Sequence, residues 1–393
     1  MLIGLVGKPS VGKSTFFKAA TLAEIEIASY PFTTIKANHG VGYVRVECID
    51  KEFKAQCQPN HGYCIKGQRF VPVDLMDVAG LVPGASEGKG LGNQFLDDLR
   101  QADVFIYIID ASGETDEGGK QTKNYDPCND VRFLENELNA WWYNIFLKVW
   151  KTFSRKAEQE KTKFSEAVAK QFSGLKVKED DVKRAIIKLN LSERPSSWGE
   201  ENLKRFVSEL RKISKPMILA ANKVDMEKGL ENYNRLKKEF PGMIIIPCSA
   251  DSEVALRQAS KAGLIEYLPG DSDFRILKEL NEKQKEALHK IKNTVLKEFG
   301  STGVQKILNM AVFDILKCVA IFPASASKLA DSKGHILPDC FLLPEGSTAL
   351  DFAFFLHTDF GKNFVKAIDA RSKRALGKTY LLQNRDALEI VAK

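Results

Sequence analysis

Hydrophobic residues gather in five short runs along the chain, and each run ends at or just before a Gly, Asp, Asn or Ser. The runs are MLIGLVG (residues 1–7), VPVDLMD (71–77), VFIYIID (104–110), KPMILAANK (215–223) and MIIIPCSA (243–250). Runs of this length with few polar interruptions predict strands buried on both faces, and therefore a mostly parallel sheet covered by helices. Such α/β sheets bind ligands beyond the carboxyl ends of their strands. The polar residues that close the runs are therefore the first candidates for a functional site.

The interval between the third and fourth runs is far longer than a strand crossover needs. From about residue 133 to 213 the sequence is rich in charge, follows a helical pattern and carries no strand signal. We therefore expect a mostly helical insertion at residues 129–215 within a main domain formed by residues 1–128 and 216–265.

An aromatic cluster, WWYNIFLKVW, lies in this insertion. Aromatic side chains can form a stacking platform for bases. Here the spacing of the apolar residues matches one face of a helix, at Trp142, Ile145, Phe146, Val149 and Trp150. That spacing favours core packing over base stacking.

The C-terminal third changes pattern twice. Apolar residues recur every three or four positions from Phe274 to Gly300, which predicts a helix ended by a glycine, and a second helix is expected from Val304 to Leu316. We assign residues 266–317 to this helical segment. From Cys318 the runs shorten to strands, turns and one short helix, which predicts a small α+β module at residues 318–393.

Composition narrows the class of protein without naming its partners. The 393 residues carry 44% apolar content, enough for two or three domains, and a formal net charge of +7. That charge permits an acidic partner such as RNA but does not require one. No apolar run reaches the roughly 20 residues of a membrane helix, and the first residues lack the features of a signal peptide. We expect a cytoplasmic, monomeric protein that does not enter membranes.

The first run leads into GKPSVGKS, the spacing of a phosphate-binding loop between a strand and a helix. In such a loop the backbone N–H groups curl around phosphate, the lysine bridges the β- and γ-phosphates, and the hydroxyl binds Mg²⁺. Lys13 and Ser14 would take the last two roles. The predicted nucleotide contacts of this loop are Gly7, Lys8, Pro9, Ser10, Val11, Gly12, Lys13, Ser14 and Thr15.

Two later strand ends predict recognition of guanine. In NKVD the carboxylate of Asp225 can accept both the ring N–H and the exocyclic amine of guanine, a pair of donors that adenine does not present. Asn222 would brace the loop and Lys223 would cover a face of the ring. In CSAD, which includes Ser249, the backbone N–H of Ala250 can meet guanine O6. GTP is the predicted ligand, and a P-loop ATPase is the alternative that Asp225 opposes.

Two further segments predict the γ-phosphate contacts. MDVAG places Asp77 at a strand end, where it can hold a Mg²⁺-bound water, and Gly80 can donate its N–H to the γ-phosphate. YPFTTIKAN offers Thr33 and Thr34, of which we favour Thr34. The expected Mg²⁺ ligands are thus Ser14, Thr34 and Asp77, and the expected catalytic residues are Lys13, Thr34, Asp77 and Gly80.

The segment DVAGLVPGASEGKGLGNQFLDDLRQAD, together with YPFTTIKAN, resembles the Obg-related GTPases, especially the YchF-like branch and its DRG relatives. The resemblance covers most of residues 1–128 and 216–250. Bacterial YchF proteins carry an altered base motif and tend toward ATP, whereas NKVD is intact here. The C-terminal motifs LPEGST, DFAFFLHTD and RALGKTYLL resemble a TGS domain, which implies contact with RNA or the ribosome, and the helical insertion is a second expected contact.

Leu81 stands where Ras-like sequences, with DTAGQ, have a glutamine, and its side chain has no group that can orient water. A partner, a monovalent cation such as K⁺ or a backbone carbonyl could complete the site, or turnover is intrinsically slow. Relatives that use potassium often carry asparagine at the position of Ser10. We expect slow hydrolysis accelerated by a ribosomal or RNA partner. The competing hypothesis is a nucleotide-sensing adaptor with negligible turnover.

Cysteines cluster at CQPNHGYC, where Cys57, His61 and Cys64 lie close together, with Cys48 upstream. Such ligands can hold zinc, and two of the cysteines could also form a disulfide. A fourth ligand is not evident, and the Cys-x6-Cys spacing is not that of a standard zinc knuckle. We expect free thiols here rather than a zinc site at Cys57, His61 and Cys64.

Overall fold

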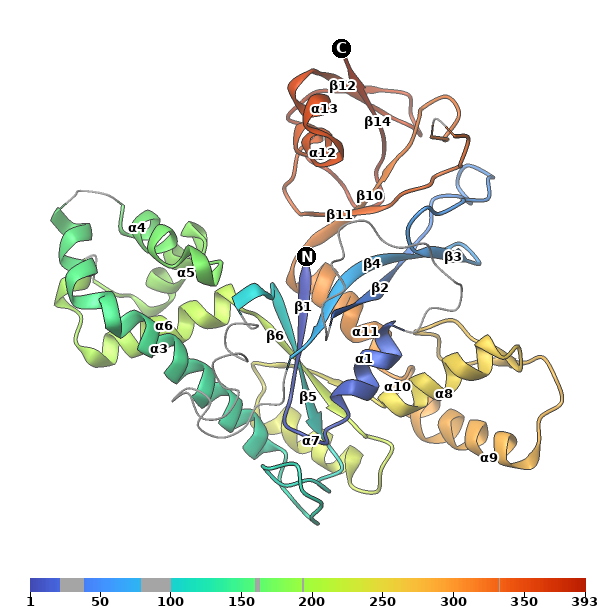
Figure 1. Cartoon of the computed structure of the whole chain (residues 1–393), viewed down its shortest axis with the longest axis horizontal. Helices are drawn as coiled ribbons and strands as arrows, with labels where there is room; N and C mark the ends of the chain where they lie inside the picture. Colours follow the sequence, from blue (N-terminus) through green and yellow to red (C-terminus); the bar gives the residue numbers. More distant parts are fainter. Residues whose placement is uncertain (22–38, 79–99, 160–162, 193, 332) are drawn as a thin grey trace.

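The computed structural model describes residues 1–21, 39–78, 100–159, 163–192, 194–331 and 333–393. Its central sheet has seven strands in the order β2-β4-β1-β5-β6-β7, with β3 paired to β4 (Figure 1). The parallel strands are β1 (Leu2–Val6), β4 (Gln68–Asp77), β5 (Val104–Asp110), β6 (Met217–Asn222) and β7 (Ile244–Pro247). They coincide with the five apolar runs. β2 (His39–Glu47) and β3 (Tyr63–Ile65) run antiparallel to β4.

Each face of this sheet supports its own hydrophobic core, which explains why its central strands are continuously apolar. Along β5, Phe105, Tyr107 and Ile109 belong to one core, and the alternate residues Ile106 and Ile108 belong to the other. All seven residues of β5 are buried. The helices that follow β1, β6 and β7 are α1 (Lys13–Thr21), α7 (Gly229–Glu239) and α8 (Ala250–Lys261).

The insertion between β5 and β6 is helical, as expected, and forms an arm at one side of the sheet (Figure 1). Its main helices are α3 (Cys128–Gln159), α4 (Phe164–Gln171), α5 (Glu179–Leu189) and α6 (Glu200–Ser214), with short 3-10 turns at Ser173–Leu175 and Pro195–Ser197. Phe146 is fully buried and stacks on Phe172, with ring centroids 3.7 Å apart. Trp142 and Trp150 also pack in this core, so the cluster is core packing, as predicted.

The helix expected from Phe274 begins later. Arg275–Ile276 forms β9, which pairs with β8 (Ile265–Glu266), and α9 spans Glu282–Ile291. Asn281 caps α9 by accepting the N–H of Gln284, whose side chain accepts the N–H of Asn281 in return. A π-helical stretch (Lys292–Leu296) and α10 (Lys297–Phe299) complete the helix up to Gly300, as expected. The second helix is α11 (Val304–Asn309) with a π-helical continuation at Met310–Ile315.

The C-terminal module is a second sheet of five strands, in the order β11-β10-β14-β12-β13. The strands are β10 (Cys318–Pro323), β11 (Phe341–Pro344), β12 (Phe364–Asp369), β13 (Ala375–Leu376) and β14 (Ala387–Ala392). Two short helices, α12 (Ala349–Leu356) and α13 (Thr358–Lys362), replace the single one expected. The helix divides because His357 is extended and accepts the N–H of Asp359, which caps α13.

Buried and surface contacts join this module to the main sheet. The guanidinium of Arg69, fully buried in β4, donates to the carbonyl oxygens of Leu337 (3.1 Å) and Pro338 (2.7 Å). Arg371 and Arg385 both pair with Glu52. Within the described ranges, no helix has the length and apolarity needed to cross a membrane.

Candidate functional site

The loop between β1 and α1 is tightly curled, and its glycines are required by geometry. Gly12 has a φ of +91°, and a Cβ there would lie 2.3 Å from the Nδ2 atom of Asn222. A Cβ on Gly7 would lie 2.7 Å from the carbonyl oxygen of Ile108. The loop also contains Ser10 at a φ of +65°, and it turns directly into α1 at Lys13. The free N–H groups at this helix start suit an anion.

Three predicted site residues meet where β1 and β4 end. The Lys13 Nζ donates to the Asp77 Oδ1 at 2.5 Å and to the carbonyl oxygen of Val78 at 2.5 Å. The Ser14 hydroxyl donates to the other oxygen of Asp77 at 3.4 Å. The structure thus brings together an ammonium, a hydroxyl and a carboxylate from segments more than 60 residues apart. Thr15 follows in the first turn of α1.

Asn222 ties the phosphate loop to the end of β7. Its Nδ2 donates to the carbonyl oxygen of Val11 at 2.9 Å, and its Oδ1 accepts the N–H of Ala250 at 3.0 Å. Ser249 caps α8 through its hydroxyl, and its N–H donates to the carbonyl oxygen of Thr302. The Asn222 side chain therefore joins both predicted base loops, NKVD (222–225) and CSAD (248–251), to the phosphate loop.

Asp225 differs from its neighbours because the described part of the chain gives its carboxylate no hydrogen bond or ion pair. The residue is half-buried in the loop after β6. Lys223, two residues earlier, has a φ of +63°, and its Nζ donates to the carbonyl oxygen of Ser10 at 3.0 Å and to Asp110 at 2.7 Å. The loop is thus braced by its lysine while its aspartate remains open to a ligand.

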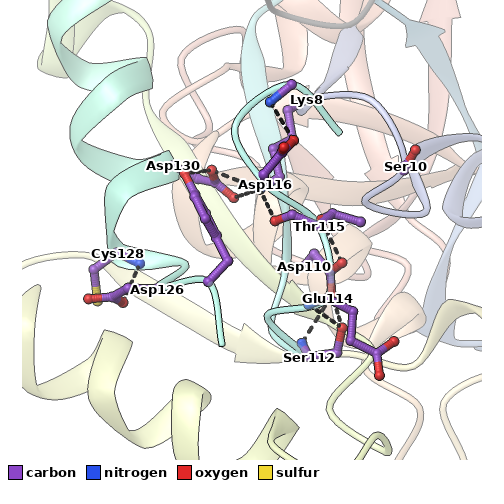
Figure 2. Close-up of polar contacts among 12 residues, drawn as sticks. Lys8, Ser10, Asp110, Ser112, Glu114, Thr115, Asp116, Asp126, Cys128 and Asp130 are labelled. Atoms are coloured by element: carbon purple, nitrogen blue, oxygen red, sulfur yellow. Dashed lines mark hydrogen bonds and ion pairs between the residues drawn. The ribbon is translucent and has the colours of Figure 1, made fainter. Parts of the chain in front are cut away.

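Asp110, at the end of β5, is a site residue that the sequence reasoning missed (Figure 2). Its buried carboxylate accepts from Lys223, from the Ser112 hydroxyl at 2.5 Å and from the Thr115 hydroxyl at 2.7 Å. Burial alone would raise the pKa of Asp110, but these hydrogen bonds hold that pKa below its ordinary value. The signal was present in the sequence, because an Asp that closes a strand is followed by Ser112 and Thr115.

Lys8 lies in the phosphate loop, but its side chain is committed to the protein (Figure 2). The Lys8 Nζ donates to the carbonyl oxygen of Thr115 at 2.9 Å and to Asp130 at 3.0 Å, and both side chains of the ion pair are 3% exposed. The Tyr125 hydroxyl donates to the same carboxylate. Gly119 also packs tightly against Pro9. A phosphate would therefore meet Lys8 through its backbone N–H alone.

Four residues singled out in the sequence, Thr33, Thr34, Gly80 and Leu81, lie outside the described residues. Their roles at the γ-phosphate and the attacking water therefore stay predictions. Hydrogen bonds among the described residues join the phosphate loop to Asp77 and to Asn222 at the carboxyl edge of the parallel sheet, where α/β proteins bind ligands.

Comparison with known protein families divides the chain into three matched regions. Residues 2–136 match the 50S ribosome-binding GTPase family, and residues 220–325 match the Obg-like GTPase YGR210-like, G4 motif-containing domain. Residues 333–392 match the TGS domain.

Relatives extend the match over the full chain. A GTP-binding protein of Methanocaldococcus jannaschii is 49% identical over 100% of this chain and 99% of its own length. The ribosome-binding ATPase YchF of Pasteurella multocida is 26% identical over 98% of this chain and 97% of its own length. The crystal structure of a GTP binding protein from Pyrococcus horikoshii superposes with a TM-score of 0.79 at 41% identity, with 100% of both chains covered. The chain belongs to the YchF-like GTPase family and ends in a TGS domain.

Proposed function

We propose that this protein binds GTP, hydrolyses it to GDP and phosphate with Mg²⁺, and acts as a switch on the ribosome or on RNA. The observation that carries the proposal is the meeting of Lys13, Ser14 and Asp77 beside a base loop whose Asp225 has no partner among the described residues. Phosphoryl transfer needs positioning and neutralisation of negative charge, and these groups supply both.

Base selection rests on Asp225. Guanine presents two donors on one edge, and both would satisfy a carboxylate that would otherwise remain unpaired on binding. The Ala250 N–H now donates to Asn222, so a contact with guanine O6 requires that this N–H be shared. Because Asn222 also holds Val11, the base loop and the phosphate loop are positioned together.

The donor set at Ser14 and Asp77 fits Mg²⁺, which prefers hard oxygen ligands and keeps several waters. The Ser14 hydroxyl, Asp77 through a water, and Thr34 would hold the Mg²⁺ ion. The ion would neutralise negative charge on the phosphates. The Lys13 Nζ lies 2.5 Å from the Asp77 Oδ1, which supports a position of its ammonium beside the phosphates. Gly80 would donate its N–H to the γ-phosphate. The Lys13 ammonium then neutralises the bridging oxygens as charge develops.

The attacking water lacks an obvious side chain to orient it, because Leu81 replaces the glutamine of Ras-like sequences. We therefore propose slow intrinsic turnover that a partner or a monovalent cation such as K⁺ accelerates. The same leucine favours a second candidate, a nucleotide-sensing adaptor with negligible turnover. The name of the YchF relatives, ribosome-binding ATPase, adds the ATPase alternative.

Single-turnover hydrolysis of [γ-³²P]GTP, with and without K⁺, separates the enzyme from the adaptor. We expect slow hydrolysis by the wild type and a loss of about 100-fold in Lys13→Ala, because one preorganised positive charge is removed from the transition state. Lys18→Ala is the matched control, since Lys18 is an exposed lysine on the same helix. Equal rates in the wild type and Lys13→Ala would contradict catalysis at this site and favour the adaptor.

The ribosome or RNA is proposed as partner on two grounds: the family names, and exposed positive charge on the TGS domain. Four basic residues of this domain, Arg371, Lys373, Arg374 and Lys378, are exposed. Arg371 pairs with Glu52 and Lys373 donates to the carbonyl oxygen of Ala326, while the side chains of Arg374 and Lys378 form no ion pair with a described residue and can meet phosphate. Cosedimentation with ribosomal subunits should be stronger with a non-hydrolysable GTP analogue than with GDP. Equal absence of binding in both states argues against this partner.

A further inference from the structure

Four potential metal ligands come together at the end of β2. Cys48 follows β2, Asp50 lies in the next turn, Cys57 lies in the loop beyond it and Cys64 lies in β3. Their ligand atoms, three Sγ and one carboxylate oxygen, all lie within 4.8 Å of one another. The cysteine spacing had pointed to His61, but its ring nitrogens are not among these atoms. The fourth ligand that the sequence did not reveal is Asp50.

The separations match ligands of a single ion. The Sγ atoms of Cys48 and Cys57 are 3.7 Å apart, and the Sγ of Cys64 is 3.9 Å from the Oδ2 of Asp50. A tetrahedral zinc with Zn–S bonds of about 2.3 Å places two sulfur ligands about 3.8 Å apart. A disulfide requires a sulfur separation of about 2.05 Å, far below the one observed.

Because these side chains are buried, their ionised forms would destabilise the folded protein unless a cation is bound. The exposed fractions of Cys48, Asp50 and Cys57 are 1%, 3% and 4%. Asp50 forms no ion pair with any described residue, and a buried carboxylate is unfavourable unless it is paired or binds a metal. The backbone N–H of Lys51 donates to the Oδ1 of Asp50 at 2.8 Å, which leaves Oδ2 directed at Cys64. Such orientation of a ligand by its neighbour is typical of metal sites.

We propose that Cys48, Asp50, Cys57 and Cys64 bind one structural zinc ion. Thiolates are soft ligands that select zinc over Mg²⁺ or Ca²⁺, and four protein ligands leave no open position for catalysis. The ion would order the loop between β2 and β3. Two N–H groups of that loop, of Gln58 and Asn60, donate at 2.8 Å to the carbonyl oxygens of Ile336 and Pro338. The zinc therefore fixes the surface on which the C-terminal segment is held.

Metal content of the full-length protein tests the proposal. The protein is equilibrated with Zn²⁺ under reducing conditions, desalted and analysed by inductively coupled plasma mass spectrometry. We expect one zinc per chain in the wild type and in Cys318→Ser, a buried cysteine outside the cluster, and well below one in Cys57→Ser. A wild type that retains well below one equivalent overturns the proposal, as does a Cys48 to Cys57 disulfide in the reduced preparation.

A second measurement keeps the test valid if Cys57→Ser fails to fold. Co²⁺ is substituted into the wild type and into Asp50→Cys, and the absorption spectra are compared. We expect the spectrum of a tetrahedral site, with sulfur-to-cobalt charge transfer that rises by about one third in Asp50→Cys as three thiolates become four. A six-coordinate spectrum in the wild type, or no change in charge transfer in Asp50→Cys, contradicts the assignment.

Discussion

At the scale of single residues, the predicted nucleotide site depends on side chains that are bound within the protein. The Lys8 ammonium is enclosed by Asp130, by the carbonyl oxygen of Thr115 and by the ring of Tyr125, 4.0 Å from its centroid. Burial raises the pKa of Asp130, and the hydrogen bonds from Lys8 and Tyr125 oppose that rise. Lys8 thus anchors the phosphate loop to the start of α3.

Removing one partner of this buried pair should be costly. Lys8→Met leaves Asp130 buried and unpaired, so we expect the free energy of unfolding to fall by about 3 kcal/mol, with most of it recovered in Lys8→Met/Asp130→Leu. Arg132→Ala, which breaks the exposed pair with Glu239, should lower the free energy of unfolding far less, because solvent screens this pair. Chemical denaturation measures all three, and equal losses in Lys8→Met and Arg132→Ala would refute the anchoring role.

At the scale of elements, the sequence predicts the helices and strands that the local apolar pattern determines. It does not predict the boundaries and side-chain contacts that depend on residues distant in the chain. The five parallel strands were predictable because burial on both faces leaves a continuous apolar run. The start of α9 was not predictable, because the helical spacing of apolar residues extends back to Phe274. In the structure Arg275 and Ile276 pair with β8, and the helix begins only after its cap at Asn281. Asp50 was missed for the same reason, because Cys64, which contacts its carboxylate, lies on β3, whereas Asp110 could have been found from the nearby Ser112 and Thr115.

The helical insertion should behave as a separate cooperative element. Phe146→Ala removes a fully buried ring that contacts Trp142, Trp150, Phe172 and Phe206, and should cost about 4 kcal/mol. Hydrogen exchange measured by mass spectrometry should show lost protection in α3, α4 and α6, with β1 and β5 unchanged. Leu147→Ala, at a neighbouring residue that is 53% exposed, is the control. Identical exchange in the two variants would show that the aromatic cluster does not hold the arm together.

At the scale of the whole molecule, a chain of hydrogen bonds links the CSAD loop (248–251) to β2, which precedes the loop that contacts the C-terminal module. The N–H of Ser249 donates to the carbonyl oxygen of Thr302, and buried Glu253 accepts from Arg257, Tyr267 and Thr302. The segment after Thr302 continues into α11, where Gln305 donates to the carbonyl oxygen of Tyr43 in β2. β2 leads in turn to the proposed zinc site and the loop that holds the TGS domain.

We propose that this site selects guanine nucleotides through Asp225, and calorimetric titration of the 393-residue protein with GTP and with ATP in Mg²⁺ measures that selectivity. We predict that GTP binds at least about 100-fold more tightly than ATP, because adenine leaves the Asp225 carboxylate unpaired. The preference should disappear in Asp225→Asn, whose amide lacks the second acceptor oxygen. Equal affinity for the two nucleotides in the wild type, or tighter binding of ATP, would contradict guanine selection by Asp225.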